Sequence, residues 1–286
     1  MEKEVGKRPR HPDLENLSVI VCVKNDEKNI GICLSRLVQE EPGEILCVDG
    51  NSNDSTRDVI QQFQVELVLG LGKGLTEDRK LGFEKSSKPY VAFIDADHFL
   101  KPGQLSNLLA ELQDGDFDVL QSSLTIPRDR FWSRAEANLL DISHNNVGVK
   151  RMVGVAPTIY RREVLERFSF DSEITSSIDD TDLFYRISTQ SDYKLAVGST
   201  LVTQNHSPAL ADYIKKFLWY GRGDGEFMVK YPARRRSMLF HLLLRYPVIF
   251  GARLILRGHF GASVLSALQG FTRMTAALIR ISALRG

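Results

Sequence analysis

Residues 18–49 read SVIVCVKNDEKNIGICLSRLVQEEPGEILCVD, and this stretch decides the fold. Its first six residues are apolar without interruption and rich in β-branched side chains, which is typical of a strand covered on both faces. Asn25 or Asp26 can then cap a helix whose apolar residues recur at the helical period. Because a second apolar strand follows at 44–49, the stretch predicts a strand, a helix and a strand with short connections.

The same alternation continues along the chain. Strands are expected at 65–69, 90–94, 117–122, 193–197 and 199–203, and helices after Thr76 and Pro102, at 131–143, at 162–168 and from Asp179. This rhythm predicts an α/β fold in which helices cover both faces of an open, mostly parallel sheet. We expect a flexible lead at 1–16, one large α/β domain at 17–210 and a basic helical segment at 211–286.

Composition excludes several classes of protein. The 286 residues are 43% hydrophobic, which is enough for a full core and excludes a disordered chain, a fibre or a disulfide-rich mini-protein. The net charge is only +1, but residues 215–286 hold thirteen Lys or Arg against two acidic residues, so the first 214 residues carry −10. This asymmetry predicts an acidic module joined to one that seeks phosphates or an anionic surface.

The cysteines and the N-terminus bear on the compartment. Cys22, Cys33 and Cys47 fall in apolar stretches and form neither a paired framework nor a metal-binding CxxC. The first 16 residues are polar and lack the apolar stretch of a signal peptide. We therefore expect reduced thiols and a cytoplasmic protein.

Acidic residues follow the predicted strands directly. Asp49 ends the second strand, and Asp95 and Asp97 end the strand at 90–94. In open parallel sheets ligands bind beyond the carboxyl ends of the strands, although a single Asp there can equally cap a helix or a turn. Asp95 and Asp97 would repel each other unless a cation lay between them, and carboxylate oxygens suit Mg²⁺ or Mn²⁺.

Four motifs in order resemble a known family. SVIVCVKNDE (18–27), VDGNSNDST (48–56), FIDADH (93–98) and IDDTDLFYR (178–186) are similar to those of inverting GT-A glycosyltransferases of family 2. The resemblance implies a nucleotide-binding sheet fused to an acceptor-binding half. It also implies transfer of a sugar from a nucleotide diphosphate sugar, with uridine diphosphate favoured, to an acceptor hydroxyl.

The same resemblance implies roles for individual residues. Asp49 would hold the nucleotide base in a pocket lined by Cys22, Asn25 and Glu27. Arg79 would lie near the pyrophosphate, Asp95 would lie near the ribose, and Ala96 would belong to the same nucleotide-sugar site. Asp97, with Asp95, would bind the metal. Asp180 would be the catalytic base, His206 a further metal ligand or diphosphate contact, and Arg222 a contact to an acceptor or donor phosphate.

Two positions depart from the family pattern, and one glycine-rich run stands outside it. Lys24 stands where Tyr is frequent, and Asp179 stands where Glu is usual, so either Asp179 or Asp180 could be the base. The run Gly70-Leu71-Gly72-Lys73-Gly74 has neither the dinucleotide nor the Walker spacing of a phosphate loop. It is interpreted as a flexible loop near the donor, with Lys73 in reach of a phosphate.

The C-terminal segment combines apolar and basic residues. Val264, Leu268, Phe271 and Leu278 lie along one helical stripe, and Arg273 and Arg280 share another direction. This pattern predicts an interfacial amphipathic helix with cations for lipid headgroups, or else an ordinary helix packed on its own domain. The longest stretch without a charged residue in this segment, Gly258–Thr272, is shorter than the roughly 18–20 residues of a spanning helix, which favours lying on a membrane.

Two alternative functions would share part of this sequence pattern. A sugar nucleotidyltransferase would share the sheet and the metal carboxylates but should show a glycine- and arginine-rich loop after the first strand, which VCVKNDEKN (21–29) is not. A non-catalytic membrane scaffold would not need the acidic set Asp49, Asp95, Asp97 and Asp180. The expected partners are therefore a nucleotide sugar, a glycan or lipid-linked acceptor and the cytosolic face of a membrane, but not nucleic acid, which the acidic domain would repel.

Overall fold

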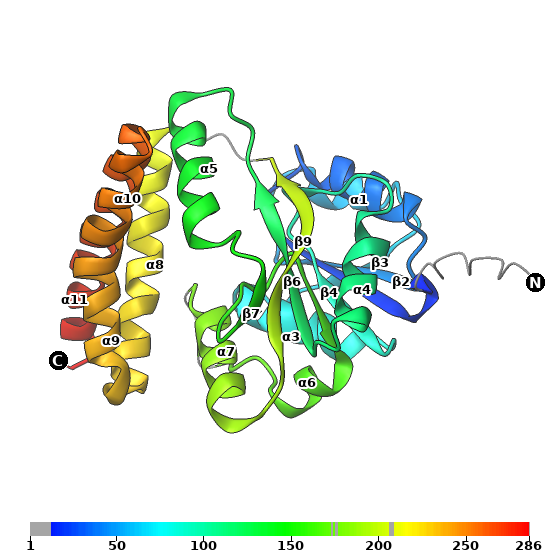
Figure 1. Cartoon of the computed structure of the whole chain (residues 1–286). Coiled ribbons are helices and arrows are strands. Elements are labelled where there is room, and N and C mark those ends of the chain that lie inside the picture. Colours follow the sequence, from blue (N-terminus) through cyan, green and yellow to red (C-terminus); the bar gives the residue numbers. More distant parts are fainter. Residues whose placement is uncertain (1–12, 173, 175–176, 206–208, 286) are drawn as a thin grey trace, which may run out of the picture.

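The computed structural model describes residues 13–172, 174, 177–205 and 209–285. Within these residues nine strands form one sheet in the order β3-β2-β1-β4-β8-β6-β9-β5, with β7 added beside β9 (Figure 1). The strands are β1 Leu17–Val23, β2 Glu44–Asp49, β3 Glu66–Leu69, β4 Tyr90–Phe93, β5 His98–Phe99, β6 Val119–Thr125, β7 Gly148–Lys150, β8 Thr158–Arg161 and β9 Leu195–Gln204. This is a mixed, mostly parallel sheet flanked by helices, as the sequence predicts.

The first four strands of the sheet all run in the same direction. β1 pairs in parallel with β2 and β4, and β2 with β3, so the ends of β1, β2 and β4 lie at the same edge. β8 is antiparallel to β4 and β6, and β6 is parallel to β9. The short β5, which follows the motif at 93–98, is antiparallel to the end of β9. These pairings bring the acidic ends of β2 and β4 and the last residues of β9 to one side of the sheet.

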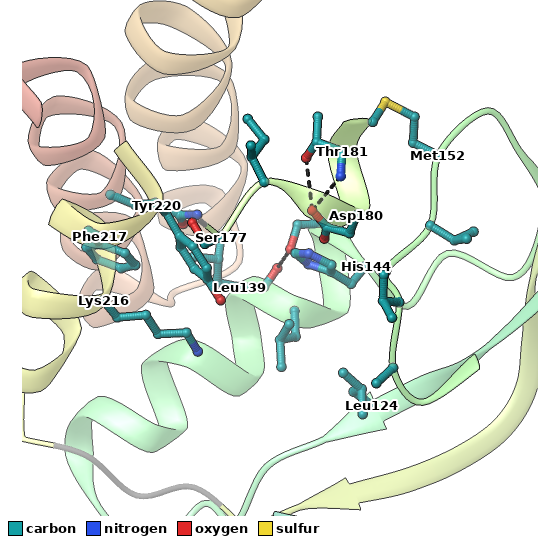
Figure 2. Close-up of a pocket in the computed structure, with 18 of the residues that line it drawn as sticks. Leu124, Leu139, His144, Met152, Ser177, Asp180, Thr181, Lys216, Phe217 and Tyr220 are labelled. Atoms are coloured by element: carbon teal, nitrogen blue, oxygen red, sulfur yellow. Dashed lines mark hydrogen bonds between the residues drawn. The ribbon is translucent and has the colours of Figure 1, made fainter. Parts of the chain in front are cut away.

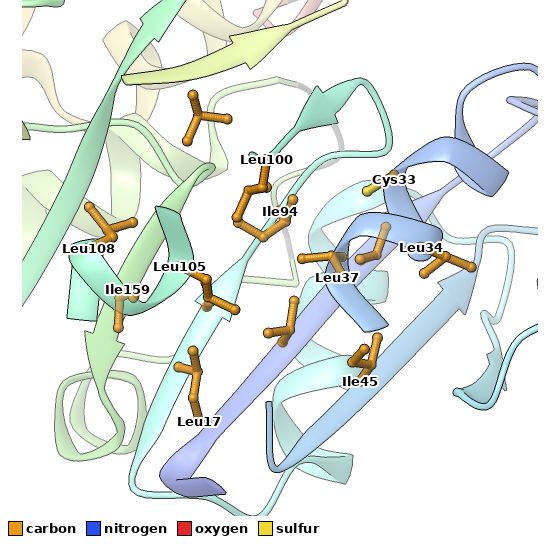
Figure 3. Close-up of a cluster of buried hydrophobic side chains, with 14 of the residues drawn as sticks. Leu17, Cys33, Leu34, Leu37, Ile45, Ile94, Leu100, Leu105, Leu108 and Ile159 are labelled. Carbon is orange, nitrogen blue, oxygen red and sulfur yellow. The ribbon is translucent and has the colours of Figure 1, made fainter. Parts of the chain in front are cut away.

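Helices cover both faces because alternate residues of each buried strand point in opposite directions. Val19 and Val21 of β1 belong to one apolar cluster, and Ile20 and Cys22 to the other. The first cluster lies under α1 Ile30–Gln39 and α4 Gln104–Asp114 (Figure 3). The second lies under α3 Leu75–Lys85, α6 Arg162–Arg167 and α7 Asp179–Gln190. The short α2, Thr56–Ile60, follows the acidic loop after β2.

The C-terminal helices form a bundle beside the α/β part, with α5 between the two (Figure 1). Its elements are α8 Leu210–Lys230, α9 Arg235–Phe240, a π-helical stretch His241–Phe250, α10 Gly251–Leu256 and α11 Phe260–Ala283; α5 is Phe131–Ser143. Gly221 of α8 permits a close approach to α11, since a Cβ at this position would lie 2.4 Å from the carbonyl oxygen of Arg273. Apolar residues of α5, α8, α10 and α11 share one cluster, which ties the bundle to the α/β part.

Most expected elements are present, but the sheet differs from the expectation in two ways. The sequence analysis did not predict β5, β7 or β8. The strands expected at 193–197 and 199–203 are a single strand, β9, because its pairing with β6 resumes after a register shift, with Val197 opposite Gln121 and Leu201 opposite Ser123. The predicted helices at 131–143 and 162–168 correspond to α5 and α6.

The prediction that Arg273 and Arg280 of α11 face lipid headgroups is wrong. Arg273 forms two hydrogen bonds with Asp224, and Arg280 contacts Glu226 of α8. Both arginines therefore hold α11 on α8 rather than reach for headgroups. Val264, Phe271 and Leu278 of the predicted apolar stripe are exposed, whereas Leu268 packs into the bundle.

Among the described residues, one helical segment is long and apolar enough to cross a membrane by length and composition alone. It is Pro232–Leu256, with a mean hydropathy of 1.5 and 22% of its most apolar window buried. This segment precedes Gly258–Thr272, the charge-free run of the sequence analysis. The expectation that the tail lies on a membrane stays a prediction.

Candidate active site

A cavity of about 550 Å³ lies between the carboxyl edge of the sheet and the C-terminal bundle. The sheet side contributes Arg79, Asp95, Asp179 and Asp180, and the other side is formed by residues of α5 and of the bundle, from α8, α11 and the π-helical stretch. Figure 2 shows Asp180 and Thr181 with His144, directly after α5, and with Lys216, Phe217 and Tyr220 of α8 around this space. Its volume lies in the range of small-molecule sites.

Arg79 organises the acidic side of the cavity. It lies on α3 and is 7% exposed; its Nη1 donates to Asp179 Oδ2 at 2.5 Å, and its Nη2 lies 3.4 Å from Asp95 Oδ1. Burial alone would lower the pKa of Arg79, but the charges of Asp179 and Asp95 outweigh it and raise that pKa. One buried guanidinium thus fixes two carboxylates that come from distant parts of the chain.

Asp180 differs from its neighbour Asp179. Its carboxylate accepts hydrogen bonds from the backbone N–H of Thr181 (2.5 Å) and from the Thr181 hydroxyl (3.1 Å), and it lines the cavity (Figure 2). Burial and the negative charge of Asp179 raise the pKa of Asp180 to about 6. Because a carboxylate with this pKa can both accept and release a proton near neutral pH, Asp180 has the chemistry of a general base. Asp179 is committed to Arg79.

Asp95, Asp97 and His98 form the one candidate metal cluster in the described part of the chain. Their ligand atoms lie within 4.8 Å of one another. Nδ1 of His98 accepts a hydrogen bond from the backbone N–H of Asp95 (3.1 Å), and its Nε2 lies 3.9 Å from Asp97 Oδ1. The carboxylate oxygens of Asp95 and Asp97 are the atoms that could hold Mg²⁺ or Mn²⁺. Gln204, at the end of β9, donates to Asp97 Oδ2 at 2.9 Å.

The sequence analysis missed His98 as a site residue. It stands within the quoted motif FIDADH, directly after Asp97, and it is only 1% exposed. A histidine following two metal-type carboxylates was the available signal.

Asp49 lies in a second, closed part of the site. It is fully buried, accepts from the backbone N–H of Ser52 and from Arg57 Nε, and is covered by the Arg57 side chain. Burial by itself raises the pKa of Asp49, but hydrogen bonds from Ser52 and Arg57 outweigh it and keep this pKa below its usual value. Asp49 is therefore an ionised acceptor, and Arg57 is a contact that the sequence analysis did not include.

Asn25 and Glu27 join two loops beside Asp49. Asn25, at a positive φ of 54°, accepts from the backbone N–H of Asn53, and Glu27 accepts from that of Ser55. These contacts tie the loop after β1 to the loop after β2. Cys22 is buried under α3 instead of open to the cavity, and burial raises the pKa of its thiol well above the usual value.

Asp78 is a further residue at this end of the sheet that the sequence analysis did not include in the site. It is 5% exposed, and its Oδ1 has no hydrogen-bond partner among the described residues. Burial and the charge of Asp49 raise the pKa of Asp78. Only its place one residue before Arg79 in the first turn of α3 could have suggested it.

Other predicted site residues lie elsewhere. Lys73 is exposed between Gly72 and Gly74, both at positive φ, and it does not line the cavity. Arg222 points away from the cavity, which Tyr220 and Asp224 line, and faces a separate hollow with Ala276 and Ile279. Ala96 is buried between the two metal-type aspartates. His206 lies outside the described residues.

Comparisons with known proteins agree with this fold. Residues 18–168 match glycosyl transferase family 2, and the chain belongs to this family. An uncharacterized glycosyltransferase of Nostoc, alr2836, is 28% identical over 168 residues, which cover 53% of this chain and 52% of that protein. The chain thus spans about half to two thirds of the length of the first curated relatives it matches.

Two groups of solved structures share the fold. The mannosyltransferase PcManGT from Pyrobaculum calidifontis, in complex with GDP-Man and Mn²⁺, superimposes with a TM-score of 0.65 at 14% identity, over 95% of this chain and 88% of that chain. S. aureus TarS 1–349, in complex with UDP-GlcNAc, gives a TM-score of 0.54 at 15% identity, over 94% and 91% of the chains. The predicted GT-A fold is confirmed.

Proposed function

We propose that this glycosyltransferase is metal-dependent and inverting, with Asp180 as the base that deprotonates the acceptor hydroxyl. The observation that carries this proposal is the contrast between the two neighbouring aspartates. Asp179 is held by Arg79, whereas Asp180 lines the cavity with a pKa raised to about 6. A single displacement with such a base opposite the leaving group inverts the anomeric carbon.

The other residues of the site position the donor relative to that base. Asp95 and Asp97 would hold Mn²⁺ or Mg²⁺, whose charge when bound offsets that developing on the diphosphate. Arg79 fixes the position of Asp95 through its 3.4 Å contact, and Gln204 orients Asp97. Asp49 offers an ionised acceptor for N–H groups of the nucleotide once Arg57 moves aside.

The direct test is Asp180→Asn in a transfer assay. The variant keeps the shape of the side chain but cannot accept the proton, so transfer should fall by about 10²–10⁴-fold while donor binding persists. Asp192→Asn, at an exposed aspartate on the loop after α7, is the matched control. Near-normal turnover of Asp180→Asn would show that Asp180 is not the base.

The donor is proposed to be a UDP-sugar, the nucleotide favoured by the family resemblance, with GDP-sugars as the competing group. Structural neighbours bind UDP-GlcNAc or GDP-Man. A thermal-shift panel of nucleotide sugars with Mn²⁺ and Mg²⁺ separates them, because a true donor stabilises the folded state by mass action. Stabilisation by GDP-sugars alone would overturn the uridine assignment.

We also propose that the C-terminal bundle lies on the cytosolic face of a membrane. Residues 227–286 contain ten Lys or Arg and no Asp or Glu. Their exposed apolar side chains include Leu244, Val248, Ile255, Leu256, Phe260, Phe271, Leu278 and Ile279, with exposures from 49 to 87%. Apolar side chains together with an excess of cations suit an anionic lipid surface.

Paired serine substitutions test the membrane proposal. Leu256→Ser with Phe260→Ser removes side chains that are 87% and 66% exposed, and binding to vesicles with anionic lipid should weaken at least tenfold. Leu69→Ser with Leu71→Ser, which are 59% and 66% exposed at the end of β3 and just beyond it, should sediment with vesicles as the unaltered chain does. Equal sedimentation of both variants would refute the proposal.

A further inference from the structure

The C-terminal bundle lines the cavity with cations. Lys216 of α8, Arg245 of the π-helical stretch and Arg273 of α11 all line the space that the proposed catalytic carboxylates also line. We call these three residues, with Tyr220 and His144, the cationic wall. All but His144 come from the part of the chain beyond residues 18–168, which match the family.

The members of the cationic wall lie close together. The Tyr220 ring centre is 5.8 Å from Lys216 Nζ and 5.4 Å from Arg273 Cζ. Arg273 also lies 5.6 Å from the ring of Tyr246, a neighbour of Arg245 in sequence. These two rings hold Lys216 and Arg273, and Arg245 lies over the ring of Phe250 at 5.1 Å, since a cation is attracted to the face of an aromatic ring.

The carboxylates near the wall do not balance its charge. Asp224 accepts both hydrogen bonds from Arg273, at 2.8 and 2.7 Å. Glu136 lies 3.5 Å from Lys216 through one oxygen, while its other oxygen accepts from the Tyr213 hydroxyl.

The third cation of the wall, Arg245, accounts for the positive charge that the carboxylates do not balance. Within the described residues it pairs with no carboxylate, and its Nη1 lies 3.2 Å from His241 Nδ1. Three cations therefore face two carboxylates at this end of the cavity, and the positive charge in excess belongs to Arg245, which is also exposed to solvent.

His144 lies beside the same charges. Its ring lines the cavity (Figure 2), and its Nδ1 lies 2.6 Å from the Ser143 hydroxyl. Burial first, and then the charges of Lys216, Arg273 and Arg245 against that of Glu136, lower the pKa of His144 to about 4. The imidazole is thus neutral at pH 7 and offers a further polar group without a competing charge.

We propose that the cationic wall binds a phosphate monoester group of the acceptor. The inference rests on the proposed function, which places the acceptor in this cavity with its hydroxyl at Asp180. Cationic donors from three separate helical elements suit a tetrahedral oxyanion with several oxygens better than a planar carboxylate, which a single arginine fork satisfies. A neutral sugar would leave the excess positive charge unpaired. The phosphate can belong to a soluble phosphorylated acceptor or to a lipid-linked one, provided that the acceptor carries a hydroxyl besides the phosphate.

Binding is tested on the full chain without donor and with EDTA, so that no metal ion offers a second phosphate site. In the soluble arm, phosphorus NMR follows the line width of glycerol 3-phosphate, and proton saturation transfer compares it with glycerol. In the lipid arm, vesicles of phosphatidylcholine with a polyprenyl monophosphate are sedimented against equally charged vesicles with phosphatidylglycerol. Preference for the phosphate monoester in either arm supports the proposal and identifies the source, and preference in neither arm overturns it.

Two neighbouring lysines provide the matched variants. Lys216→Gln removes a cation of the wall, whereas Lys215→Gln removes one whose side chain is 79% exposed on the outer side of α8. Loss of one charge-assisted contact should weaken phosphate binding about tenfold or more in Lys216→Gln and Arg245→Gln but not in Lys215→Gln. Lys216→Arg should restore binding, and thermal unfolding midpoints confirm that each variant is folded.

Equal effects of Lys215→Gln and Lys216→Gln would overturn the proposal. Such a result would leave the proposed function untouched, because sugar transfer and its loss in Asp180→Asn are measured separately. Conversely, full activity of Asp180→Asn would overturn the base assignment even where phosphate binding depends on Lys216.

Discussion

The acid limb of the pH–rate profile should report Asp180. Its pKa is raised from an ordinary value of 3.8 to about 6, because burial and the charge of Asp179 disfavour the carboxylate. A general base works only when ionised, so the active fraction falls from about nine tenths at pH 7 to about one tenth at pH 5. We expect kcat/KM, which reports the free enzyme, to fall about tenfold between these pH values.

Replacing the neighbouring charge should move this limb. Asp179→Asn removes a negative charge that raises the pKa of Asp180 and frees the Arg79 cation, which lowers it. The limb should therefore shift toward the ordinary pKa, and the variant should keep a larger share of its own pH 7 rate at pH 5. Calorimetry of donor binding at both pH values controls for loss of the substrate complex. A flat profile from pH 7 to pH 5 in the unaltered chain, or an unmoved limb in Asp179→Asn, would refute the reasoning.

Three further substitutions test the metal site, the helix packing and the buried ion pair. Asp97→Ala should abolish metal-dependent donor binding, and unchanged calorimetry with a nucleotide sugar and Mn²⁺ would place the metal elsewhere. Gly221→Ala should lower the melting temperature, because a Cβ 2.4 Å from the Arg273 oxygen costs about 1–3 kcal/mol of packing, more than the roughly 1 kcal/mol gained in helix propensity. Gly251→Ala, whose Cβ meets only Ser263 Oγ at 3.3 Å, should not lower it. Arg79→Met should cost about 3–5 kcal/mol of unfolding free energy in urea titrations, since it leaves Asp179 buried without its partner; a loss below 1 kcal/mol would argue that Asp179 is not charged.

Local pattern was sufficient for much of the fold. The buried strands β1, β2 and β4 and the helices between them follow from apolar periodicity, because burial on both faces of a sheet requires continuous apolar strands. The positions of Asp49, Asp95 and Asp97 at strand ends follow from the same reading, since parallel strands end at one edge. The single strand β9 was predicted as two because Gly198 and Ser199 interrupt the apolar pattern without ending the pairing.

Contacts between residues that are distant in the sequence could not be predicted from local sequence patterns. Arg79 and Asp179 are 100 positions apart, and their contact distinguishes the held carboxylate from the free one. The place of His98 in the site became visible only through the hydrogen bond that its Nδ1 accepts from the Asp95 backbone. Arg57 over Asp49 likewise depends on how α2 follows its loop.

By itself, the sequence determined an α/β sheet with acidic residues at the ends of its strands, followed by a basic, apolar tail. The tertiary structure alone decided where the charges of that tail point. Arg273 and Arg280 turn inward to Asp224 and Glu226, while Lys216 and Arg245 line the cavity. A helical period places a residue on one side of its own helix, but only the neighbouring helices determine whether that side meets protein, cavity or solvent.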